Sequence, residues 1–203
     1  MTTTNLRTIK LVQLALFSAI IFLMAFTPIG YIKTPGLEIT LLVVPVTVGA
    51  IVLGPVAGAI LGGMFGLTSF IQCFGISAFG ATLLGINPIG TFIVTMIPRI
   101  LMGWLAGLIF IGMKKIDKTK LKGISYAVAN LAGPLLNTVF FMGTLVLFFY
   151  QTDYLQGFAD TLGTENVFTF ILAFVGVNGL IEAAVCFVLG TAISKTLDVL
   201  AKK

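Results

Sequence analysis

Long apolar segments follow one another along this chain, and they constrain its fold more than any other feature. A helix needs about 20 consecutive apolar residues to cross a bilayer core. Six runs of roughly that length are present: Leu11–Thr27, Glu38–Leu53, Pro55–Gln72, Ile89–Met113, Gly123–Tyr150 and Val167–Ile193. We therefore predict an all-α membrane protein with six transmembrane helices in one bundle, forming a single domain over residues 1–203.

Composition excludes the main soluble classes. Of the 203 residues, 58% are hydrophobic and 9% are charged, whereas a soluble domain carries about 25% charged residues. A soluble enzyme, a nucleic-acid-binding module and a disordered protein are all excluded on this ground. The first apolar run has the position of a signal peptide. It is long for one, however, and no small-x-small cleavage site follows, so we retain it as a helix.

The segments between the apolar runs differ in character. Gly54-Pro55 is short enough to make a tight helical hairpin of the runs on either side. Cys73–Pro88 is glycine-rich but apolar, and we expect a loop packed at the membrane surface. Lys114–Lys122 is a charged connector, and Gln151–Asn166 is expected to be a polar loop.

Basic residues are distributed very unevenly about the predicted spans. Six spans place both termini on one side, and only Lys33 falls on the opposite side. Ten basic residues fall on the side of the termini: Arg7, Lys10, Lys114, Lys115, Lys118, Lys120, Lys122, Lys195, Lys202 and Lys203. Cytoplasmic loops carry the excess of lysine and arginine, so both termini are predicted to be cytoplasmic.

The residues that usually perform catalysis are missing or scattered. The chain has no histidine, which excludes Ser-His-Asp and Cys-His catalysis and the usual zinc sites. Cys73 and Cys186 are far apart, and Asp117 and Asp198 are isolated cytoplasmic charges. We predict no catalytic residues, no metal and no cofactor, and a membrane enzyme is disfavoured.

Small residues recur at a spacing of four on two helices, which places them on one helix face. The first run carries Ala15 and Ala19, and the third carries Gly54, Gly58, Gly62 and Gly66. Small residues let membrane helices approach closely. The glycine stripe is expected either to pack inside the bundle or to dock another membrane subunit.

Arg99 and Glu182 are the ionisable residues well inside predicted spans. Arg99 lies about ten residues into its span, roughly 15 Å deep at 1.5 Å per residue. A charge at that depth normally faces a partner or an aqueous cavity. Two interpretations stay open: a structural Arg99–Glu182 pair, or a guanidinium that binds an anionic ligand.

Three asparagines accompany these charges. Asn178 and Glu182 share one helix face, Asn137 is in the middle of the fifth span, and Asn87 precedes Pro88 where it can cap a helix. Each asparagine could instead bond across helices. Their convergence on the last three spans favours a solute site in that half of the bundle, with the first three spans serving for packing.

Several short motifs resemble a known family. They are Gln13–Ala19, Thr27–Gly30, Leu37–Thr40, Val44–Val46, Leu53–Gly58, Phe65–Leu67, Asn87-Pro88, Pro98–Gly103, Leu136–Thr138 and Asn178–Glu182. Together they resemble a substrate-binding S component of an energy-coupling factor (ECF) vitamin transporter, closest to the pantothenate and cobalamin branch.

This resemblance implies an architecture and a set of partners. It implies six helices in a bacterial cell membrane, with a ligand pocket that opens outward and is closed by the loop between the first two helices. It implies an ECF transmembrane coupling subunit, which Ala15 and Ala19 would contact, and two cytoplasmic ATPase subunits. We also assign Gly58 and Gly62 to the docking of a partner. The chain itself would hydrolyse nothing.

The ligand expected from this resemblance is pantothenate. Arg99 would bind its carboxylate, Asn137, Asn178 and Asn87 would contribute polar contacts, and Glu182 would hold Arg99 in place. The outer segments contain no tryptophan and few aromatic residues, which argues against a large flat ligand. Cobalamin, pyridoxine, biotin, folate and riboflavin remain alternatives, as does a stand-alone secondary carrier.

Overall fold

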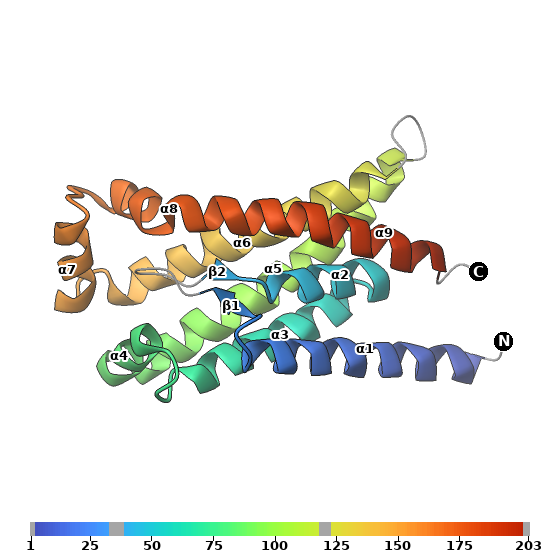
Figure 1. The fold of residues 1–203 in the computed structure, drawn as a ribbon, viewed down its shortest axis with the longest axis horizontal. Coiled ribbons are helices and arrows are strands. Elements are labelled where there is room, and N and C mark those ends of the chain that lie inside the picture. The colour runs from blue at the N-terminus through green and yellow to red at the C-terminus, as the bar shows by residue number, and fades with distance from the viewer. Residues whose placement is uncertain (1–2, 33–38, 118–122, 201–203) are drawn as a thin grey trace.

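The protein is an elongated helical bundle (Figure 1). The computed structural model describes residues 3–32, 39–117 and 123–200. Its elements are α1 (Thr3–Ala25), β1 (Tyr31–Ile32), β2 (Ile39–Thr40), α2 (Val43–Leu53), α3 (Pro55–Gln72), α4 (Ala78–Ile86), α5 (Pro88–Asp117), α6 (Ile124–Phe149), α7 (Asp153–Thr161), α8 (Val167–Val185), a π-helical turn (Cys186–Gly190) and α9 (Thr191–Leu200). Helix α1 begins and α9 ends at the same end, which we call the terminal end (Figure 1).

Within the described residues, five helical stretches are long and apolar enough to cross a membrane: Arg7–Ala25, Pro55–Gln72, Pro88–Lys115, Ile124–Phe149 and Asn178–Leu197. The third and fifth predicted runs therefore match α3 and α6 closely. The expected helix over 38–53 is wrong in its first part, because Ile39–Thr40 form β2, which pairs with β1 as a short antiparallel hairpin. Glu38 itself lies outside the described residues.

Helix α2 is short because its sequence fixes where it can begin. Pro45 has no amide hydrogen and is accommodated without losing a helical hydrogen bond in the first turn of a helix, and it is the third residue of α2. The 11 residues of α2 rise about 16 Å, roughly half of a bilayer core. Every residue from Val43 to Ile51 is buried, which explains why the run is apolar on all faces.

Two segments expected to be loops contain helices, at the end of the bundle opposite the termini (Figure 1). In Cys73–Pro88, the Ser77 hydroxyl accepts a hydrogen bond from the Gly80 amide and caps α4. In Gln151–Asn166, Thr152 caps α7 by accepting from the Leu155 amide. Both predictions of a loop were wrong because these hydroxyl caps start short helices.

The last apolar run is interrupted rather than continuous. Gly176 has φ 44° and ψ −136°, a conformation that breaks α8 and that glycine adopts without a steric penalty. The π-helical turn Cys186–Gly190 then precedes α9. The expected single helix over 167–193 is therefore a kinked one, whose spanning part is Asn178–Leu197.

Three of the four glycines of the stripe pack inside the bundle, against α5, whereas Gly54 lies before α3 and has open space around it. A Cβ atom on Gly58, Gly62 or Gly66 would collide with backbone atoms of Gly103, Arg99 or Thr95, respectively. Gly58 and Gly62 are buried by this contact. Their assignment to partner docking is therefore wrong: the absence of side chains serves a backbone-to-backbone seam between α3 and α5.

Ala15 and Ala19 have a different environment. Helix α1 packs on α3 and α2 along one side, and both alanines are exposed. Their surroundings on that face are apolar, with Leu11, Val12 and Leu16 well exposed. This face is therefore available to lipid or to another membrane protein.

A buried polar network joins three helices near the terminal end. The Asn130 amide of α6 donates to the Ser194 hydroxyl of α9 at 3.1 Å and to the Tyr126 carbonyl at 2.8 Å. The Thr47 hydroxyl of α2 donates to Asn130 Oδ1 at 3.0 Å. Asn130 is thus fully used in holding α2, α6 and α9 together.

Candidate ligand-binding cavity

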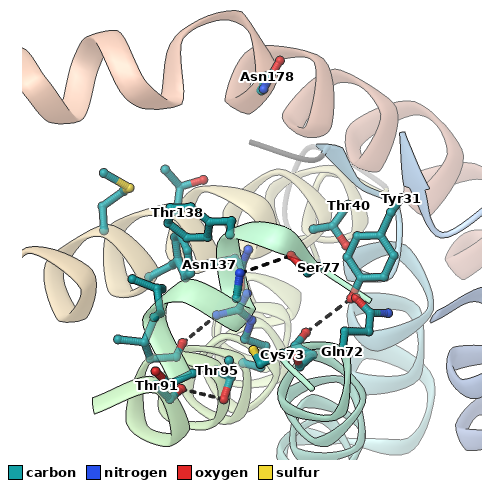
Figure 2. A pocket seen from close by; sticks show the side chains of 18 of the residues that line it. Tyr31, Thr40, Gln72, Cys73, Ser77, Thr91, Thr95, Asn137, Thr138 and Asn178 are labelled. Carbon is teal, nitrogen blue, oxygen red and sulfur yellow. Dashed lines mark hydrogen bonds between the residues drawn. The ribbon is translucent and has the colours of Figure 1, made fainter. Parts of the chain in front are cut away.

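A cavity of about 390 Å³ lies among β1, β2, α3, α4, α5, α6 and α8. This volume is within the range of about 300–1,000 Å³ typical of small-molecule sites. Hydroxyl, amide and thiol groups line the cavity together with apolar side chains such as Leu83, Val94 and Met142. The residues labelled in Figure 2 carry the polar groups: Tyr31, Thr40, Gln72, Cys73, Ser77, Thr91, Thr95, Asn137, Thr138 and Asn178. The cavity therefore suits a small molecule that has both polar and apolar parts.

Arg99 is the cation of the cavity, and the helix positions it through a proline. Pro98 has no amide hydrogen, so it leaves the Val94 carbonyl without its helical donor. The Arg99 Nη1 donates to that carbonyl at 2.7 Å. The guanidinium also lies over two rings, 5.3 Å from the Phe65 centroid and 4.7 Å from that of Phe141. These contacts hold the guanidinium at the cavity, and Arg99 as a whole residue is 9% exposed.

In the described part of the chain, Arg99 and Glu182 face the same cavity without a direct ion pair between them. Within residues 3–32, 39–117 and 123–200, no ion pair joins these two side chains, although both line the cavity. Arg99 Nε and Glu182 Oε1 are buried there without a hydrogen-bond partner. The backbone amide of Thr40 faces the Glu182 carboxylate. The expected structural Arg99–Glu182 pair is therefore not formed, and both groups remain available to a ligand.

The three predicted asparagines separate into two groups. Asn137 and Asn178 line the cavity from α6 and α8 (Figure 2). Asn137 is 6% exposed, and its Oδ1 has no partner among the described residues. Asn87 does not line the cavity. Its Oδ1 accepts from the Gly90 amide at 2.9 Å, so the cap is the role that the structure supports, and the ligand-binding assignment is corrected.

Several polar residues of the cavity were not found by reading the sequence. Thr91, Thr95 and Arg99 line it from one face of α5, and their spacing of four was a usable signal. The Thr91 and Thr95 hydroxyls donate to backbone carbonyls, which leaves their lone pairs to accept from a ligand. Thr40 and Gln72 gave no such signal, because they come together only through the hairpin and the end of α3.

Aromatic rings gather where α4, α7 and α8 meet. The Phe79 centroid lies 5.9 Å from that of Tyr154, 6.3 Å from that of Phe158 and 6.0 Å from that of Phe174. Phe79 also lines the cavity. The expectation that the outer segments offer few rings was therefore wrong, since helices α4 and α7 concentrate them at one place.

The family of the chain follows from comparison with known proteins. Residues 9–194 match the family described as the ECF transporter, substrate-specific component. The chain belongs to this family. The resemblance found in the sequence is thereby confirmed, and with it a multi-pass membrane protein of a transporter family rather than an enzyme family.

Two curated relatives of this substrate-specific component carry similar names. The pantothenate transporter PanT of Leuconostoc mesenteroides is 28% identical, over 98% of this chain and 97% of the relative. The pantothenic acid transporter PanT of Lactococcus lactis subsp. cremoris is 33% identical, over 78% of this chain and 76% of the relative.

Proposed function

We propose that this chain captures pantothenate for an ECF importer. The observation that carries the proposal is that Arg99 is buried at the cavity without a direct ion pair to any carboxylate of the described residues, because such a buried guanidinium is a strong site for an anion. Pantothenate has one carboxylate, an amide and two hydroxyls. The names of the two relatives point to the same ligand.

The main polar side chains of the cavity can each be assigned to a group of pantothenate. Arg99 binds the carboxylate, while Asn137 and Asn178 bond the amide and hydroxyls. Glu182, which does not pair with Arg99, accepts a hydrogen bond from a hydroxyl instead of orienting the guanidinium. The wall of threonine hydroxyls supplies further acceptors.

The proposal includes an orientation and a set of partners. The five spanning helices and the buried α2 make up the six segments of the bundle, with both termini in the cytoplasm. Residues of α4 line the cavity, and α4 lies at the end opposite the termini (Figure 1), so the cavity would face outside. The exposed Ala15 and Ala19 face of α1 would meet the coupling subunit, and two ATPase subunits would supply the energy.

Binding of radiolabelled pantothenate to the purified chain, without ATP, tests this function. We expect saturable binding, weakened at least about tenfold by Arg99→Ala through loss of a charge-assisted hydrogen bond. Arg99→Lys should restore only part of it, because an ammonium cannot form the bidentate pair. The alcohol analogue of pantothenate, which lacks the carboxylate, is the control and should be nearly indifferent to Arg99→Ala.

Two results would contradict the proposal. Equal losses for the acid and the alcohol would make Arg99 a structural residue. Gradient-driven uptake into liposomes that contain this chain alone would instead support a secondary carrier, a class in which broken helices such as α8 are common.

A further inference from the structure

Gln72 connects the cavity with the helix that carries Ala15 and Ala19. It is the last residue of α3, it is 5% exposed, and it lines the cavity. Its Nε2 donates to the Ala25 carbonyl at 2.7 Å. Ala25 is the last residue of α1, where carbonyl groups have no partner within their own helix. A side chain of the cavity therefore completes the end of α1.

The chain beyond Ala25 leads directly into the wall of the cavity. The Thr27 amide donates to the Met24 carbonyl and the Gly30 amide to that of Thr27, which turns the backbone into β1. The Leu41 amide then donates to the Gly30 carbonyl at 2.9 Å. Fixing the Ala25 carbonyl therefore fixes the entry to the β1–β2 hairpin.

A second contact supports the same connection. The Tyr31 hydroxyl of β1 lies 3.3 Å from the Ser69 hydroxyl, about one turn before Gln72 on α3. Tyr31, Ser69 and Gln72 all line the cavity, and Figure 2 shows Tyr31 and Gln72 on the same side of it. The outer end of α3 thus faces the cavity while holding both the end of α1 and the start of the hairpin.

We infer that Gln72 couples occupancy of the cavity to the end of α1. In the described part of the chain, the hydrogen bond of this side chain uses Nε2 and leaves Oε1 to the cavity. The amide is planar, so a ligand that donates to Oε1 also holds Nε2 on the Ala25 carbonyl. Pantothenate has hydroxyl and amide donors for this contact, and to that extent the inference rests on the proposed function. Gln72 is a positioning residue, and the ligand signals through it to the docking helix.

Hydrogen exchange of the backbone amides in residues 26–30 tests the coupling. In the native chain, saturating pantothenate should slow exchange of the Thr27 and Gly30 amides at least about threefold, because both donate within the turn that follows Ala25. The Phe26 amide, which donates to the Phe22 carbonyl at the end of α1, should be slowed as well. Gln72→Met, close in size but without either hydrogen bond, should bind about two- to tenfold more weakly, as expected for one neutral hydrogen bond. At saturation it should show no slowing in this segment.

Thr138→Val is the matched control, because Thr138 lines the cavity from α6, on a helix away from the end of α1. At saturation this variant should keep the slowing seen in the native chain. The same slowing in Gln72→Met as in the native chain would overturn the inference, and so would binding to the native chain without any slowing. Absence of pantothenate binding to the native chain would instead refute the proposed function. If Gln72→Met does not fold, the comparison of free and saturated native chain still decides whether the turn responds.

Discussion

Two asparagines on α6 show how the half of the molecule near the termini, which holds the Asn130 network, differs from the half that holds the cavity. Asn130 is fully buried, and its side chain bonds to Thr47, Tyr126 and Ser194. Asn137, two turns further along the same helix, has a buried Oδ1 without a partner and faces the cavity. The residue type and the helix are the same, so the difference in role comes entirely from what the neighbouring helices offer.

The same contrast holds for other polar groups. Among the described residues, four of the five with a buried side-chain polar atom lacking a partner line the cavity: Thr40, Arg99, Asn137 and Glu182. The fifth is Thr191, at the start of α9. An unpaired polar group inside a membrane protein is costly, so a cluster of them at a cavity indicates that a ligand completes the hydrogen bonds.

The largest effect is expected at the α3–α5 seam, which both halves share. Gly62→Leu would push a side chain into the Arg99 carbonyl, where backbone atoms cannot yield. Overpacking costs about 1–3 kcal/mol or more, and here it also displaces Arg99. We expect loss of the folded species in size-exclusion chromatography. Gly143→Leu, at a position with open space around the glycine, should remain folded. Equal behaviour of the two variants would show that the seam is not tight.

The second largest effect is expected for Asn130→Ala, which should lower the free energy of unfolding. It removes the hydrogen bonds to Thr47 and Ser194, and bonds between membrane helices average about 0.6 kcal/mol each. With the loss of packing, we expect about 1–3 kcal/mol, seen as a lower melting temperature in detergent. Pantothenate affinity of the fraction that remains folded should be unchanged. An affinity loss larger than that of Asn137→Ala would erase the distinction between the two asparagines.

The sequence predicted the bundle well wherever an apolar run was also a continuous helix. It failed where the local chemistry of a few residues overrode the run. Pro45 delays the start of α2, Ser77 and Thr152 start short helices, and Gly176 breaks α8. Hydropathy averages over about 20 residues, so it cannot detect features that a single cap or glycine decides.

The cavity was predictable where its residues share one helix or are unusual for a membrane. Arg99 and Glu182 stood out because charge is rare at such depth. Their failure to pair was not predictable, because it depends on the geometry of Pro98 and the Val94 carbonyl. Gln72 was also missed, since its partner Ala25 is brought to it only by the packing of α1 on α3.

Asn137→Ala should have the opposite signature to Asn130→Ala. It removes an acceptor that has no partner among the described residues, so we expect a stability change below about 1 kcal/mol. Pantothenate binding should weaken about two- to tenfold through loss of one hydrogen bond. Thermal melting and equilibrium binding, measured on both variants, give the complete comparison. A variant that melts early but binds normally would place Asn137 with Asn130 as a structural residue.

The smallest effect on the isolated chain is expected at Ala19, which belongs to neither half. Ala19 is exposed on α1, so a larger side chain there can extend away from the bundle. Ala19→Trp should therefore leave both the melting temperature and pantothenate binding of the purified chain unchanged. Pantothenate uptake by cells that contain the whole importer should nevertheless be lost, because a tryptophan would hold α1 away from a partner that needs close helix contact. Ala81→Trp is a suitable control on the small helix α4, away from this face of α1. Loss of binding in the isolated Ala19→Trp variant would show that this face packs within the chain, and the docking role of Ala15 and Ala19 would then be wrong.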